Sequence, residues 1–154
     1  MTSGEIAQRL AGRVEEDLAL FERFHALCEE ELSWLERPDI EGLETLLEGK
    51  EALMKEIEER AEESAPLWTR FAEEGGEGGE RGEDSLIGRM EENVGRIRTL
   101  IGRIQEVESA AADRLAQRKR EAQDALGSLG RGGRALSAYR PVRIFSPRFL
   151  DKRE

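Results

Sequence analysis

Apolar residues recur every three or four positions along three stretches of the chain, the period of an α-helix that buries one face. The first helix is predicted from about Glu5 to Glu36, because Thr2 followed by Glu5 has the spacing of a capping box. Pro38 should end it, since the residue before a proline leaves the helical conformation, and Asp39 can cap the next helix. The predicted buried face of the first helix consists of Val14, Leu18, Phe21, Cys28, Leu32 and Leu35.

The second helix is predicted to follow after a tight turn and to fade near Ser64-Ala65-Pro66, where the proline removes a backbone donor, with residues 67–72 as a possible last turn. A short connection makes the pair an antiparallel hairpin spanning residues 1–72. Trp34 and Trp68 are expected to pack in its core. The buried face of the second helix is predicted to hold Ile40, Leu43, Leu47, Met54, Ile57 and Ala61.

The third helix, predicted over residues 85–127, has the most regular pattern, a heptad seam. It is longer than its partners, so its distal part should overhang the hairpin or await another partner. Residues 73–84 are acidic and glycine-rich and are interpreted as a flexible linker to it. The seam consists of Ile87, Met90, Val94, Ile97, Ile101 and Ile104.

A Gly-Arg pair recurs every seven residues beside this seam, at 88–89, 95–96 and 102–103. Each glycine inside a helix costs about 1 kcal/mol relative to alanine. Three explanations are open: a partner backbone approaches closely there, the helix is softened, or the repeat reflects chance duplication.

The predicted fold is all-α, an elongated three-helix coiled-coil bundle made of the hairpin and the long third helix, as one structural domain. A flexible basic tail follows over residues 128–154. It contains the single Tyr and two of the five Phe, which suggests a segment that orders on binding.

Composition excludes several function classes. Of the 154 residues 38% are charged and 5% aromatic, and the net charge of −10 opposes general binding to phosphate backbones. The basic residues gather in the second half, and the stretch 114–120 favours an acidic protein partner, or the acidic hairpin itself, over nucleic acid. Acidic runs such as Glu29-Glu30-Glu31 are interpreted as a solvated helix face.

Little catalytic chemistry is available. Glu22 and His25 have the Glu-x-x-His spacing of di-metal bundles, but the chain has one His, so we expect no metal, no cofactor and no enzyme. His25 is expected to be a packed or hydrogen-bonded residue, and Cys28, the single cysteine, a small core residue. Without an export signal or a membrane anchor in the sequence, a cytoplasmic location is expected.

The hairpin sequence from 27 to 53, with Leu-x-x-Leu-Leu-Glu-x-Lys-Glu-x-Leu at 43–53, resembles the FlgN-like family of flagellar type III export chaperones. The order of hairpin, variable linker, long helix and Tyr-bearing tail is similar to that family, as is the terminal Phe-Leu-Asp-Lys-Arg at 149–153. The resemblance implies a chaperone that binds hook-associated proteins, the hook-to-filament junction proteins, and delivers them to the export gate.

In that family the client's C-terminal helical segment is bound by the chaperone's C-terminal helix, and a tail tyrosine contacts the cytoplasmic domain of the export gate. The matching tyrosine is Tyr139, although Arg140-Pro141 follows it where the family often has Gly; Phe149 and Leu150 extend the expected docking segment. The alternatives are another secretion chaperone or a self-associating coiled-coil scaffold, with a homodimer possible in the absence of client. The client-binding residues implied are Met90, Val94, Ile97, Leu100, Ile101, Ile104, Val107 and Leu115.

Overall fold

The computed structural model describes residues 1–74 and 85–128. This part of the chain folds into three helices, α1 (Ser3–Leu35), α2 (Leu43–Glu73) and α3 (Leu86–Ser128), and contains no strand. The predicted all-α class and the three helical segments are confirmed. The boundaries of α1 and α3 lie within two residues of those predicted.

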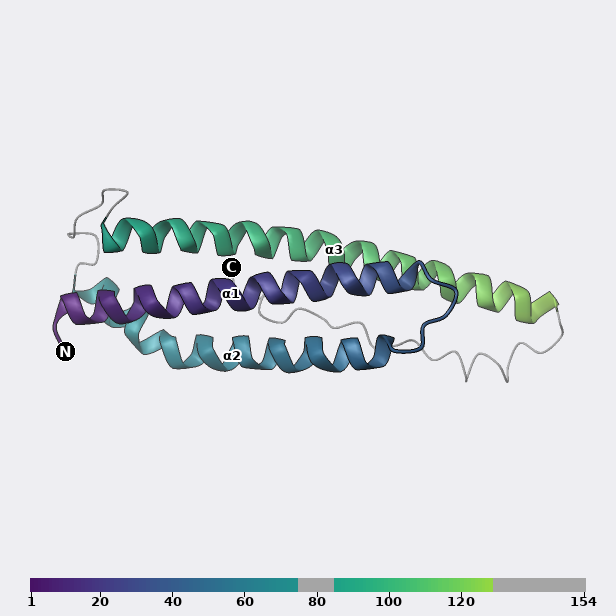
Figure 1. The fold of residues 1–154 in the computed structure, drawn as a ribbon, viewed down its shortest axis with the longest axis horizontal. Helices are drawn as coiled ribbons and strands as arrows, with labels where there is room; N and C mark the ends of the chain where they lie inside the picture. Colours follow the sequence, from purple (N-terminus) through teal and green to yellow (C-terminus); the bar gives the residue numbers. More distant parts are fainter. Residues whose placement is uncertain (75–84, 129–154) are drawn as a thin grey trace.

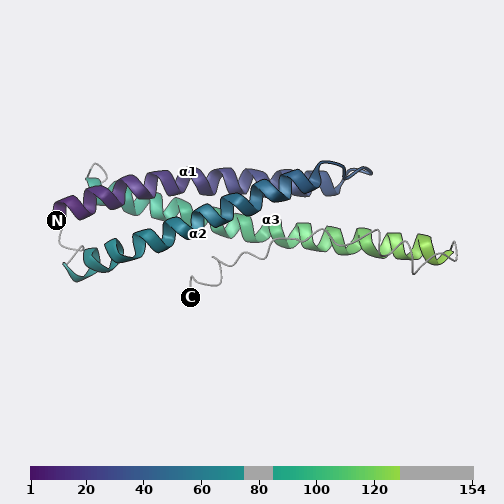
Figure 2. The same cartoon turned by 90° about the horizontal axis from the view of Figure 1, so that it is seen from below.

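The three helices form an elongated bundle in which α1 packs against both others (Figures 1 and 2). α2 runs antiparallel to α1, and α3 runs parallel to α1 and continues past the α1–α2 turn (Figure 1). The core has three levels. At the end where α1 begins it holds Ile6, Leu10, Val14 and Met90, in the middle Phe21, Phe24, Leu53, Met54, Ile101 and Ile104, and near the turn Leu35, Leu43 and Ala111.

The capping box at the start of α1 is confirmed, with the Glu5 amide donating to the Thr2 hydroxyl and the Thr2 amide to the Glu5 carboxylate. The prediction that Asp39 caps the second helix was wrong. Its carboxylate accepts from the Glu41 amide at 2.8 Å and shapes the turn instead, because α2 begins three to four residues further on, after Gly42. Gly42 has φ +98°, and the Trp34 ring lies 3.3 Å from where its Cβ would be, so only glycine fits.

The second helix does not fade near Pro66 but runs through it to Glu73, so that the possible last turn over residues 67–72 is part of it. The proline removes one backbone donor, yet the turns beyond it bury apolar surface, because Leu67 and Phe71 pack against the cluster that contains Ile6 and Leu10. The packing of these apolar side chains therefore outweighs the tendency of Pro66 to end the helix. The two residues expected in the core on this part of α2 were also wrong: Ala61 and Trp68 are both exposed, while Ser64 is buried.

The predicted overhang of the third helix is present. Ala111 is the last buried residue of α3, and beyond Arg118 most of its residues are exposed. Both views show these last turns extending away from the hairpin (Figures 1 and 2). This length of helix has little of the hairpin beside it.

Candidate functional site

The predicted client-binding seam of α3 is packed against the hairpin. Met90, Ile101 and Ile104 are buried, and the other five predicted residues are half-buried. Met90 joins the cluster at the start of α1, while Ile101 and Ile104 join the central one. The seam is therefore closed in this structure. The half-buried members are Val94, Ile97, Leu100, Val107 and Leu115.

A cluster of polar side chains lies inside the core where the three helices meet. Lys50 of α2 is fully buried, and its Nζ lies 2.7 Å from Glu31 Oε1 on α1 and 2.6 Å from Glu108 Oε1 on α3. The thiol of Cys28 also donates to Glu108 Oε1, at 3.6 Å. Glu108 Oε2 is buried and has no hydrogen-bond partner among the described residues. One cation thus faces two carboxylates in a site shielded from water.

Burial governs the protonation of this cluster. Burial, with the neighbouring carboxylates, raises the pKa of the Cys28 thiol to about 12, which keeps it protonated and unreactive. Burial also raises the pKa of Glu108, although Lys50 partly opposes this. For Lys50 burial alone would lower the pKa, but the negative charges around it and its hydrogen bonds to Glu108 and Glu31 raise it overall. Lys50 is therefore charged at neutral pH.

Sequence reasoning missed this cluster. Glu31 belongs to the run Glu29-Glu30-Glu31, which was expected to be solvated, and for Glu31 that expectation was wrong, since it is 2% exposed. Cys28 is a buried core residue as expected, but it also hydrogen-bonds a carboxylate. The available signal was Lys50, which is the lysine of the hairpin motif that resembles the family.

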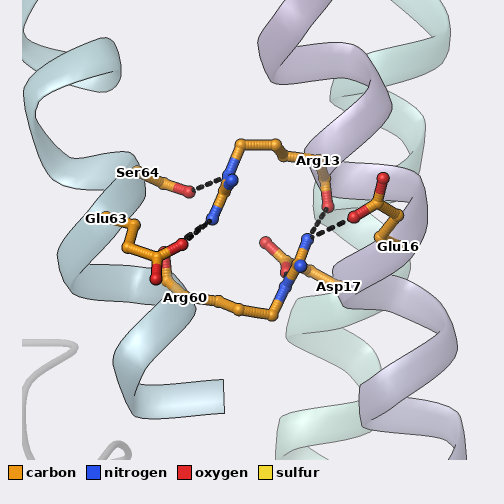
Figure 3. A network of polar contacts seen from close by, with 6 residues as sticks. All are labelled: Arg13, Glu16, Asp17, Arg60, Glu63 and Ser64. Carbon is orange, nitrogen blue, oxygen red and sulfur yellow. Dashed lines mark hydrogen bonds and ion pairs between the residues drawn. The ribbon is translucent and has the colours of Figure 1, made fainter. Parts of the chain in front are cut away.

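Two arginines join α1 to α2 through reciprocal contacts (Figure 3). Arg13 of α1 donates to the Ser64 hydroxyl at 2.6 Å and pairs with the Glu63 carboxylate at 3.2 Å. Arg60 of α2 returns the contact, to Asp17 at 2.6 Å and Glu16 at 2.8 Å.

Each arginine also donates to the backbone carbonyl of the other. Both side chains are about four-fifths buried, so solvent screens these ion pairs only partly. The network involves no residue of α3. The hairpin is therefore held by contacts of its own.

The basic stretch of α3 contacts the end of α1 near the hairpin turn. Arg118 donates to the carbonyl of Leu35, the last residue of α1, and to the carbonyls of Arg37 and Pro38 in the turn that follows, the closest at 2.7 Å. Arg114 pairs with Glu36 at 3.1 Å. These contacts agree with the predicted alternative in which the basic stretch meets the acidic hairpin.

An open groove of about 780 Å³ lies between α1 and α3, with Arg114 and Arg120 in its lining. Leu32, Val107 and Ala110 supply apolar surface in it, and charged residues from both helices surround them. The groove borders the half-buried end of the predicted seam.

The other candidate residues have structural surroundings. His25 is 17% exposed and its Nδ1 lies 3.3 Å from Glu29, in keeping with the expected hydrogen-bonded helix residue. Within the described ranges, no group of three or more His, Cys, Asp or Glu side chains is arranged to hold a metal ion. None of the helices described there is long and apolar enough to cross a membrane.

The surroundings of two of the three repeated glycines show whether another backbone approaches them. A Cβ at Gly95 or Gly102 would meet nothing within 4 Å, so no backbone in residues 1–74 or 85–128 approaches closely there. Approach of another chain's backbone, softening of the helix and chance remain as explanations. The linker residues 75–84 and the tail with Tyr139, Phe149 and Leu150 lie outside the described residues.

The chain matches the family model described as FlgN protein over residues 1–141, which includes all three helices. The comparison with curated proteins gave no match, and neither did that with solved structures. The match covers most of the chain, including the hairpin motif, the long third helix and Tyr139. This chain belongs to the FlgN protein family, a family of flagellar export chaperones that bind flagellar proteins.

Proposed function

We propose that this protein binds hook-associated junction proteins through α3, keeps them from assembling prematurely in the cytoplasm, and delivers them to the flagellar export gate. The observation that carries the proposal is the apolar seam of α3, which packs on a hairpin joined by its own arginine network. Family membership supports a flagellar protein as the client.

Binding would proceed by exchange of partners along α3. In the closed state α3 packs its seam on α1. A client's amphipathic C-terminal helix would replace α1 on this seam, in the helix-in-groove manner. The contacts of Arg13 and Arg60 would hold α1 and α2 together while α3 moves. The overhanging turns of α3 offer a first point of contact for the client.

Docking at the export gate is proposed for the tail. Tyr139 lies within the segment that matches the family, whereas Phe149 and Leu150 lie beyond it. Client and gate would then be bound by different parts of the chain, so a client can stay bound while the tail docks.

The client step is tested by copurification of the tagged full-length protein with junction proteins, either intact or lacking the C-terminal helix. Light scattering then gives the mass of each complex. A stable complex that is lost with that helix supports the proposal. No complex with any junction protein, together with a dimeric mass for the 17.4 kDa chain, would favour the self-associating scaffold.

The gate step is tested by Tyr139→Ala, with Tyr139→Phe as the control that keeps the ring. Tyr139→Ala should weaken binding to the cytoplasmic domain of the export gate and leave client binding unchanged. Loss of both activities would show that the tail serves the structure of the whole chain and is not a separate docking site.

A further inference from the structure

Glu108 is the only charged side chain of α3 that is buried in the closed bundle. It lies on the seam one turn after Ile104, so it faces the hairpin together with the apolar residues. Its contacts come from both other helices, Lys50 of α2 and Cys28 of α1. Docking of α3 therefore removes one carboxylate from water, and only one of its two oxygens gains a partner among the described residues.

The two charges that stay with the hairpin are already paired. Lys50 is 2.7 Å from Glu31 without any contribution from α3. When α3 leaves, Lys50 keeps this carboxylate and Glu108 regains the hydration of both oxygens. When α3 docks, a second negative charge enters a buried site in which Lys50 is the one cation that the described part of the chain supplies.

Buried ion pairs commonly contribute less than apolar residues of similar size, because desolvation offsets the Coulomb attraction. Here the desolvation cost is larger, since within residues 1–74 and 85–128 the site has two carboxylates for one cation and one carboxylate oxygen without a hydrogen-bond partner. The apolar seam supplies the attraction between α3 and the hairpin, and the Glu108 carboxylate reduces it.

We propose that the Glu31–Lys50–Glu108 cluster is a release device, which lowers the free energy of docking of α3 and so keeps the seam available to a client. The client part of this inference rests on the proposed function. The release of α3 itself is a property of the free protein.

The rate at which the Cys28 thiol is labelled can measure how often α3 leaves the hairpin. Cys28 is the only cysteine of the chain, it is fully buried, and its sulfur lies against Glu108. A thiol reagent such as DTNB therefore reacts only when the bundle opens around Cys28. Departure of α3 is the opening that a change at Glu108 should affect, so the labelling rate in native buffer follows the population of that open state. Rates are divided by that of the urea-unfolded chain, so that differences in intrinsic thiol reactivity cancel.

Glu108→Leu should slow labelling of Cys28 by at least about fivefold, because an apolar side chain strengthens docking. Glu108→Gln should slow it in the same direction, since it removes the charge and keeps the shape, and it serves if the leucine variant does not fold. Glu106→Leu is the matched control: it makes the same change at an exposed position two residues away and should leave the rate unchanged.

Unchanged or faster labelling in both folded Glu108 variants would overturn the inference, because the cluster would then anchor α3. A second arm measures binding of a junction-protein C-terminal segment, which should weaken in Glu108→Leu by a factor similar to the slowing. Slower labelling with unchanged client binding would support the release device and contradict the proposed function, so the two can fail separately.

Discussion

At the residue scale, the most informative side chains are those of the buried cluster. Sequence periodicity located Cys28 in the core, but it placed Glu31 on a solvated face and attached no role to Lys50 or Glu108. The reason is physical: a charged residue is buried only when its partners are, and these partners are 19 and 58 residues from Lys50 along the chain. Periodicity within one helix contains no information on contacts at that distance.

Lys50→Met should destabilise the protein strongly, because it leaves Glu31 and Glu108 facing each other without a cation. We expect the free energy of unfolding at pH 7 to fall by about 3 kcal/mol or more. Urea denaturation followed by circular dichroism measures it. Lys55→Met, an exposed lysine on the same helix, should change it by less than about 0.5 kcal/mol. Similar stabilities for the two variants would show that water relieves the carboxylates.

The protonation of Glu108 should give stability a distinct pH dependence. Its pKa in the folded protein is raised above the ordinary 4.5, so the folded state binds this proton more tightly than the unfolded state. The contribution of Glu108 is therefore full below pH 4.5 and is lost as pH rises through the raised pKa.

Glu108→Gln removes this dependence while every other carboxylate stays in place. The stability of the wild type relative to Glu108→Gln should fall as pH rises above 4.5. Urea unfolding of both proteins over a pH series checks this. A difference that is constant with pH would mean that the Glu108 pKa is the same folded and unfolded.

At the element scale, the boundaries of α1 and α3 and the heptad seam could be predicted because local signals set them, the capping box at Thr2 and the spacing of the seam. The start and the end of α2 could not be predicted from local signals. Asp39 had a suitable residue type for a cap, but Gly42 and the packed Trp34 ring shift the start of the helix. Beyond Pro66 the contacts of Leu67 and Phe71 with distant residues decide the length.

The repeated glycines of α3 yield a prediction for this helix. Gly95→Ala and Gly102→Ala should each stabilise the protein by about 0.5–1 kcal/mol, because the added methyl group meets open space and alanine favours the helix. Urea unfolding measures this, and the exchange of the α3 amides should slow. Destabilisation by either substitution would reveal a close contact on this flank that the isolated chain does not show.

At the scale of the whole molecule, the bundle combines a hairpin joined through partly buried arginine contacts and a third helix joined through an apolar seam that contains one buried carboxylate. The elongated arrangement and the overhang could be predicted from helix lengths and from the tight turn. The sequence could not predict which residues of the seam are covered, because their burial depends on how α1 packs between α2 and α3. In the proposed function the hairpin of α1 and α2 stays together while α3 leaves it to bind the client.

Hydrogen exchange on the full-length protein, free and in complex with a junction-protein C-terminal segment, tests the central claim most directly. The account predicts that amides of residues 90–106 exchange faster in the free protein than those around Arg13 and Arg60, and that client binding protects them. Equal protection of residues 90–106 with and without client would contradict it, because α3 would then stay on the hairpin throughout.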